Sequence, residues 1–176
     1  MTLAWNGVGI CVLFLAALTA RSVALAGFCL DSLIEIGAST VVLWELADSA
    51  RDRRRRATRL IGTAFVALAL FLAVQSTAVI VVGFHAGRSV LGIVWTAITA
   101  VAMFLLAAGK ARTGSALDNA VLRTEGKVTL VDGILASAVL LGLVLNAALG
   151  WWWADPCAGY VLVYYGLREA RAAFGG

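Results

Sequence analysis

Long apolar stretches, separated by short charged or turn-like breaks, constrain this sequence more than any other feature. A bilayer core of about 30 Å is crossed by roughly 20 apolar residues in a helix. Cut at its breaks, the sequence yields six pieces near that length, and we predict membrane-spanning helices near residues 3–20, 22–47, 60–84, 89–109, 125–150 and 152–172. The predicted fold is therefore all-α, a single domain over residues 1–176 with six transmembrane helices.

The composition agrees with a location in the membrane. Hydrophobic residues make up 62% of the 176 residues and charged residues 14%, with a single proline. A soluble globular protein of this size needs more polar surface than that. The formal charge of +4 does not indicate a nucleic-acid partner, because the basic residues form no stripe with interleaved aromatic residues. We expect a multi-pass protein of the cell membrane, the cytoplasmic membrane if the source is bacterial, in contact with the lipid bilayer.

The basic residues predict the orientation. Twelve of the 14 Lys and Arg residues lie in the links 48–59 and 110–127 and in the tail beyond residue 167. If the six predicted helices alternate in direction, all twelve fall on one side, and Arg21 and Arg88 fall on the other. Short loops rich in Lys and Arg stay in the cytoplasm. The prediction is that this side, with both termini, is cytoplasmic.

Four of the ten acidic residues occupy unusual positions. Six are expected to be ordinary charges of the membrane interface, namely Glu45, Asp48, Asp52, Asp118, Asp155 and Glu169. The other four lie in or at the mouth of predicted helices, namely Asp31, Glu35, Glu125 and Asp132. Each ionised group at membrane depth costs on the order of 3 kcal/mol, and no Lys or Arg of the sequence is expected at that depth to pair with them. A proton or a bound cation is therefore expected to offset their charge.

The spacing of these acids favours a cation. Asp31 and Glu35 are four residues apart and share a helix face, so their oxygens can clasp one divalent ion. On the fifth predicted helix, Thr129 and Glu125 share a face with Asp132. The second predicted helix runs inward, which puts Glu35 about 6 Å nearer the cytosol than Asp31, and Asp132 is expected near the level of Glu35. We predict a ladder of carboxylates between the two sides of the membrane.

Three stretches resemble the cation diffusion facilitator family of metal/proton antiporters, also called the cation efflux family. They are "LAWNGVGICVLFLAALTARSVALAGFCLDS", similar to the family's first hairpin, "GFCLDSLIEIGASTVVLWEL", similar to its second helix, and "VTLVDGILASAVLLGLVLNAALGWWWADPCAGYVLVYYGLREA", similar to its fifth-to-sixth hairpin. The family's transport site takes two ligands four residues apart on each of the second and fifth helices. Asp31 and Glu35 match the first pair and Asp132 matches one member of the second, whereas Val128 stands at the position of the family's histidine.

The resemblance also implies what the site carries. A divalent cation is the expected substrate, with protons as the counter-ion, and a homodimer is the expected assembly. Three carboxylates without an imidazole favour harder ions such as Mn²⁺ or Fe²⁺ over Zn²⁺. The identity of the ion stays open among Zn²⁺, Mn²⁺, Fe²⁺ and Co²⁺. Thr129, a water or Glu125 is left as the fourth ligand. The family's cytoplasmic domain follows its sixth helix, and we expect this chain, which stops at Gly176, to lack it.

Three functional classes follow from the sequence. The first is a divalent metal cation transporter that exports metal from the cytoplasm by alternating access in exchange for protons. The second is a metal-binding membrane sensor or modulator without transport, and the third is a small exporter of organic cations. An enzyme is not expected, because the sequence contains no Ser/His/Asp or Cys/His set, no phosphate-binding glycine loop and no HExxH motif.

Overall fold

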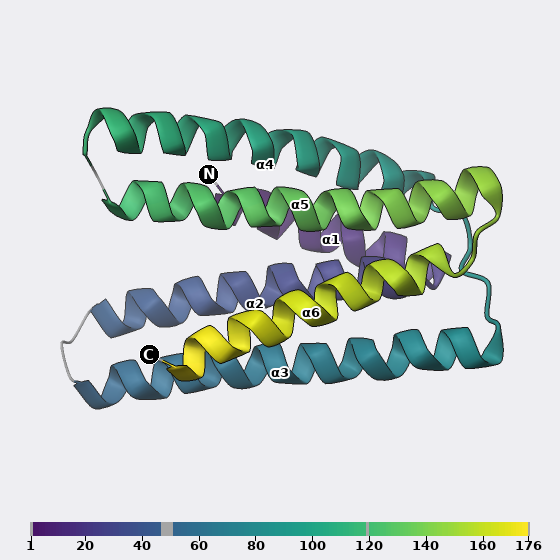
Figure 1. Ribbon diagram of the computed structural model, residues 1–176, viewed down its shortest axis with the longest axis horizontal. Coiled ribbons are helices and arrows are strands. Elements are labelled where there is room, and N and C mark those ends of the chain that lie inside the picture. The colour runs from purple at the N-terminus through teal and green to yellow at the C-terminus, as the bar shows by residue number, and fades with distance from the viewer. Residues whose placement is uncertain (1, 47–50, 119, 176) are drawn as a thin grey trace.

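Six α-helices make up the residues that the computed structural model describes. These residues are 2–46, 51–118 and 120–175, with side chains described for 5–37, 59–118 and 126–174. In chain order the helices are α1 (Thr2–Ala20), α2 (Val23–Leu46), α3 (Arg51–Val82), α4 (Val90–Ala116), α5 (Ala120–Leu149) and α6 (Ala154–Gly175). They lie roughly along one direction, and consecutive helices run in opposite directions (Figure 1). The predicted all-α class and the order of six helices are confirmed.

The helices extend beyond the predicted spans at the end of the bundle that carries both termini. Helix α3 begins at Arg51 rather than near residue 60, and α4 continues to Ala116 rather than ending near residue 109. Most of the two charged links is therefore helical. Arg, Lys and Ala are strong helix formers, so the end of an apolar stretch is not the end of its helix.

The outer surface of the bundle is apolar. Within the described residues, three segments are long and apolar enough to cross a membrane, Arg59–Val82, Val90–Ala116 and Gly126–Leu149, and Trp5–Ala20 is a shorter apolar helix. Large aliphatic side chains point outward, as shown by Val81, which is 80% exposed, and Leu105, which is 69% exposed. Soluble monomers rarely expose so much contiguous apolar surface. These features suggest a multi-pass membrane protein.

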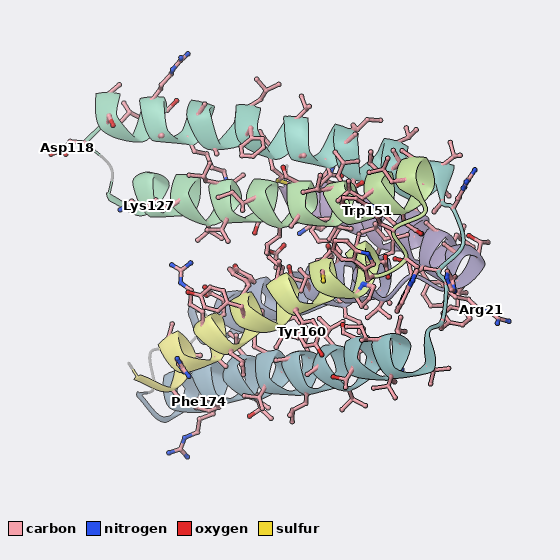
Figure 2. All side chains as sticks on the ribbon, turned by 45° about the vertical axis from the view of Figure 1, so that its right-hand side comes forward. Arg21, Asp118, Lys127, Trp151, Tyr160 and Phe174 are labelled. Atoms are coloured by element: carbon pink, nitrogen blue, oxygen red, sulfur yellow. The ribbon has the colours of Figure 1, made fainter. Side chains whose placement is uncertain are left out.

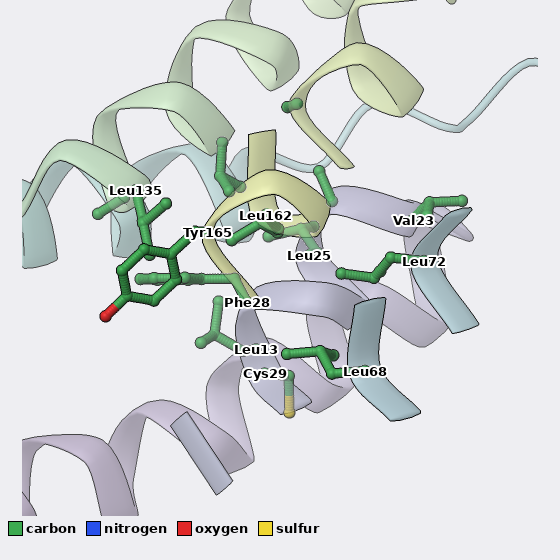
Figure 3. Close-up of a cluster of buried hydrophobic side chains, with 14 of the residues drawn as sticks. Leu13, Val23, Leu25, Phe28, Cys29, Leu68, Leu72, Leu135, Leu162 and Tyr165 are labelled. Atoms are coloured by element: carbon green, nitrogen blue, oxygen red, sulfur yellow. The ribbon is translucent and has the colours of Figure 1, made fainter. Parts of the chain in front are cut away.

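Helix α2 lies at the centre of the packing. It contacts α1, α3, α5 and α6, while α4 packs mainly against α5, and α3 mainly against α6. The buried core between them contains Leu13 of α1, Phe28 of α2, Leu72 of α3, Leu135 of α5 and Leu162 of α6 (Figure 3). Any side chain on the inward face of α2 is therefore surrounded by several other helices.

The two ends of the bundle differ in their side chains. Figure 2 shows Arg21 and Trp151 at one end, and Asp118, Lys127 and Phe174 at the other. At the first end, the ring of Trp151 stacks on that of Trp153 with centroids 5.1 Å apart. Tryptophans are common where a membrane meets water, so this end fits a position at one membrane surface.

A buried carboxylate caps α2 at the Arg21 end. Asp155, in the first turn of α6, is fully buried. It accepts a short hydrogen bond from the Ser22 hydroxyl and further bonds from the backbone N–H groups of Val23 (2.9 Å) and Ala24 (3.5 Å). The Ser22 hydroxyl oxygen in turn accepts from the Leu25 N–H at 3.1 Å. The expectation that Asp155 is an ordinary interface charge is wrong, because helix N-termini stabilise anions through their unpaired N–H groups.

The connection between α3 and α4 is attached to the same end. The Gly87 N–H donates to the Ala20 carbonyl at 2.7 Å, where α1 ends. Asn146 of α5 donates from its side-chain nitrogen to the Ala86 carbonyl at 3.0 Å. Together with Asp155, these bonds tie α1, α2, α5 and α6 to one another at this end of the bundle.

We expect Asp155→Leu to lower the thermal unfolding midpoint of the purified protein in detergent by several degrees. The leucine leaves the Ser22 hydroxyl and the N–H groups of Val23 and Ala24 buried without an acceptor, at a cost of about 1–3 kcal/mol per group. Asp155→Asn keeps one acceptor oxygen and is expected to lower the midpoint less. Equal midpoints for Asp155→Leu and the wild type would show that the cap does not stabilise the fold.

Candidate functional site

Carboxyl groups from α2 and α5 meet inside the bundle. The side chains of Glu35 and Asp132 lie within hydrogen-bonding reach of each other. Asp31 lies one turn nearer the start of α2 and is only 3% exposed. Asp31 and Glu35 lie roughly 12 Å and 18 Å along α2 from its first residue. The expectation that Asp132 lies at the level of Glu35 is confirmed.

The three acids line one small cavity. It is enclosed by α1, α2, α4 and α5, and its other polar lining residues are Asn6, Ser32 and Thr99. Apolar and aromatic side chains, among them Phe28 and Trp95, complete the wall. The cavity has a volume of about 10 Å³, which is about the room that one water molecule needs by the same measure. Only a guest of the size of a water molecule or a monatomic ion fits without a change of conformation.

The carboxyl oxygens in this cavity are incompletely satisfied. One oxygen each of Asp31 and Asp132, Oδ1 in both cases, is buried without a hydrogen-bond partner. A buried polar atom without a partner is costly, and two ionised carboxylates in contact repel each other. A proton or a cation held between Glu35 and Asp132 removes that repulsion, and either one is a chemical requirement of this arrangement.

Helix α1 contributes a residue that the sequence analysis did not single out. The side-chain nitrogen of Asn6 donates a hydrogen bond to Oε2 of Glu35 at 2.8 Å. Beside it, the Trp5 ring stacks on Trp95 with centroids 5.2 Å apart, and the Trp5 ring N–H donates to the Thr99 hydroxyl at 3.3 Å. The first turns of α1 are thereby held against α2 and α4. The sequence offers one indication of this role, because Asn6 is the only amide side chain in an otherwise apolar predicted helix.

The predicted fifth-helix residues other than Asp132 lie away from the cavity or outside the described residues. Val128 is 49% exposed, on the outer face of α5. Thr129 is buried, but its hydroxyl accepts a hydrogen bond from the Lys110 ammonium at 3.0 Å, and it does not line the cavity. The side chain of Glu125 is outside the described residues. The structure thus brings together Asp31, Glu35 and Asp132 from the predicted set.

Two further charged residues face the site. Lys110, on the part of α4 that extends beyond the predicted span, interacts electrostatically with Glu35 and Asp132. The sequence analysis expected no basic partner for these acids at membrane depth. Lys110 lies beyond the predicted span, and it acts on Glu35 and Asp132 because α4 continues as a helix and carries it against α5. Glu169 of α6 interacts electrostatically with Asp31 and Glu35. It is more than an ordinary interface charge, because α6 packs on α2.

Glu35 and Asp132 form a pair of contacting acids at the cavity. Among the described residues, no three His, Cys, Asp or Glu side chains form a group that could hold a metal ion as they stand. A divalent ion bound by both carboxylates would take the place of the proton that they share, because metal ligands must be deprotonated.

The chain matches no model of a known protein family and no curated protein sequence. The resemblance to cation diffusion facilitators therefore rests on the three stretches quoted above. What the site does must be inferred from its own residues and their chemistry.

We expect Asp132→Asn to stabilise the ion-free protein, and to do so more strongly as pH rises. At low pH the wild-type acids hold a proton, so their contact is favourable. As pH rises the wild-type pair loses that proton and the carboxylates repel, whereas the asparagine amide still donates to Glu35. The measurement is the thermal unfolding midpoint in detergent with a chelator, from mildly acidic to strongly alkaline pH.

Asp118→Asn is the matched control for this prediction. Asp118 is an exposed acid with a positive φ of 46°, a conformation that asparagine also adopts readily. Its substitution is expected to leave the pH dependence of the midpoint unchanged. A similar pH dependence for Asp132→Asn and the wild type would show that Glu35 and Asp132 do not share a proton.

Proposed function

We propose that the protein is a divalent metal cation transporter that exports the metal from the cytoplasm in exchange for protons. The observation that carries the proposal is the meeting of Asp31, Glu35 and Asp132 at a cavity for one small guest, inside a bundle whose outer surface is apolar. Ionisable groups at membrane depth are costly and mark ion pathways.

The proposed mechanism is competition between cation and proton for the same oxygens. When the site opens to the cytoplasm, a divalent cation separates Glu35 and Asp132 and displaces their proton, because metal ligands must be deprotonated. When the site opens to the other side, protons displace the cation and the acids close on each other again. Since the site accepts one guest or the other, a proton gradient drives cation export.

The proposed topology has six membrane-spanning helices with both termini in the cytoplasm. The antiparallel order of the helices brings the start of α3, the end of α4 and the end of α6 to one end of the bundle (Figure 1). Most of the Lys and Arg residues lie in these segments, and such segments remain cytoplasmic. Glu35 then lies nearer the cytoplasm than Asp31, and Lys110 and Glu169 lie on the cytoplasmic side of both. A homodimer remains part of the proposal on the resemblance alone.

A metal-binding sensor or modulator without transport is the second candidate. The observation that favours it is Val128, which is 49% exposed and stands where the resemblance expects a histidine, so that α5 contributes a single carboxylate to the site. An exporter of organic cations is less well supported, because the cavity, at about 10 Å³, is too small for an organic molecule.

The deciding experiment is metal flux into proteoliposomes under an imposed pH gradient, with Zn²⁺, Mn²⁺, Fe²⁺ and Co²⁺ compared. We expect gradient-dependent flux of at least one ion in the wild type. Asp31→Ala and Asp132→Ala are expected to abolish the flux, because each removes a carboxylate from the cavity. Asp118→Ala, which removes an exposed acid distant from the cavity, is expected to retain it.

The outcomes separate the candidates. Metal-dependent thermal stabilisation in detergent without flux would favour the sensor or modulator. Flux of an organic cation without any metal binding would favour the third class. Flux that persists in both Asp31→Ala and Asp132→Ala would refute a path through these carboxylates.

A further inference from the structure

Asn6 is the uncharged polar residue of the cavity that is bound directly to one of the acids. Its side-chain nitrogen donates to Glu35 at 2.8 Å. The same amide carries a carbonyl oxygen, so a rotation about the last side-chain bond exchanges a donor for an acceptor at this position. Asn6 therefore suits either state of Glu35: it can donate to the free carboxylate or present an oxygen to a cation.

The other uncharged polar groups of the cavity are already engaged. The Ser32 hydroxyl donates to the Phe28 carbonyl one turn earlier, at 3.1 Å. The Thr99 hydroxyl accepts from the Trp5 ring N–H at 3.3 Å. Each hydroxyl is oriented by its present bond, although its oxygen keeps a further lone pair. Asn6 differs from both in being bonded directly to an acid of the proposed site.

A second feature of the cavity indicates a missing ligand. Oδ1 of Asp31 is buried without a hydrogen-bond partner, and the whole side chain is only 3% exposed. Asp31 lines the same cavity as Asn6 and Glu35. A buried acceptor without a donor, next to two further acids, is the arrangement expected where a cation binds.

The position of Asn6 is itself well defined. Trp5, its neighbour in sequence, stacks on Trp95 and is hydrogen-bonded to Thr99, so the start of α1 is held against α4. The fifth-helix alternatives do not reach the cavity: Val128 points outward, and Thr129 is engaged with Lys110. Neither Val128 nor its neighbour Thr129 therefore supplies a ligand in place of the histidine that the resemblance expects on α5.

We propose that Asn6 supplies the fourth ligand, a carbonyl oxygen from α1, to a cation held by Asp31, Glu35 and Asp132. This inference rests on the proposed function and specifies its substrate class. Carboxylate and amide oxygens alone suit a hard divalent ion such as Mn²⁺, whereas Zn²⁺ favours nitrogen and sulfur ligands. Asn6 is then a residue that determines specificity, on a helix that the resemblance does not assign to the site.

The test compares Asn6→Leu and Asn6→His with the wild type, by titrating the purified full chain in detergent with MnCl₂ or ZnCl₂. We expect Asn6→Leu to weaken Mn²⁺ binding roughly tenfold or more. Asn6→His, which supplies an imidazole nitrogen, is expected to raise the Zn²⁺ affinity relative to the Mn²⁺ affinity by roughly tenfold. The ratio of the two affinities is informative even if a variant is less stable.

Asn146 provides the matched control. It is an asparagine buried on α5, and its amide is bonded to the Ala86 carbonyl rather than to an acid. Asn146→Leu and Asn146→His are expected to change stability but not the ratio of Mn²⁺ to Zn²⁺ affinity. An equal change in the ratio for Asn146→His and Asn6→His would show that the effect is not local to the site.

The results distinguish this inference from the proposed function. If the wild type binds Mn²⁺ and loses it in Asp31→Asn, but both Asn6 variants keep the wild-type ratio, Asn6 is not a ligand and the transporter proposal stands. If the wild type binds neither ion, or if Asp31→Asn binds as the wild type does, the metal site itself is refuted and Asn6 with it.

Discussion

The contact between Glu35 of α2 and Asp132 of α5 is the interaction on which the interior of this protein depends. Two carboxyl groups do not rest against each other in an apolar bundle unless a proton or a cation lies with them. Helix α2 also contacts α1, α3 and α6. The pair therefore lies on the helix that the others surround.

The surroundings of the pair differ on its two sides. Toward the Arg21 end lie Asp31 and a core of leucine and phenylalanine side chains. Toward the other end lie charged partners from two further helices, Lys110 of α4 and Glu169 of α6. Charges of opposite sign therefore face the pair from one side, and an apolar core lies on the other. For the proposed transporter, the charged side would be the side of cation entry.

Much of the fold and half of the site are predictable from the sequence, for different reasons. The helices follow from apolar length, and Asp31 and Glu35 share a face because they are four residues apart. Asp132 follows from depth, since the antiparallel order of α2 and α5 fixes its level. The contributions of Asn6, Lys110 and Glu169 depend on how α1, α4 and α6 are rotated about their own axes. Rotation is decided by contacts between helices, such as the stacking of Trp5 on Trp95, and no local pattern encodes it.

The cap that Asp155 forms on α2 makes that end of the helix a natural pivot. A rigid helix that tilts about one end moves each residue in proportion to its distance from that end. A tilt of about 10° about Val23 moves Asp31 by roughly 2 Å and Glu35 by roughly 3 Å, given the rise of 1.5 Å per residue. Such a tilt would therefore move Glu35 away from Asp132 by more than it would move Asp31. The pair would open on the side that Lys110 and Glu169 face.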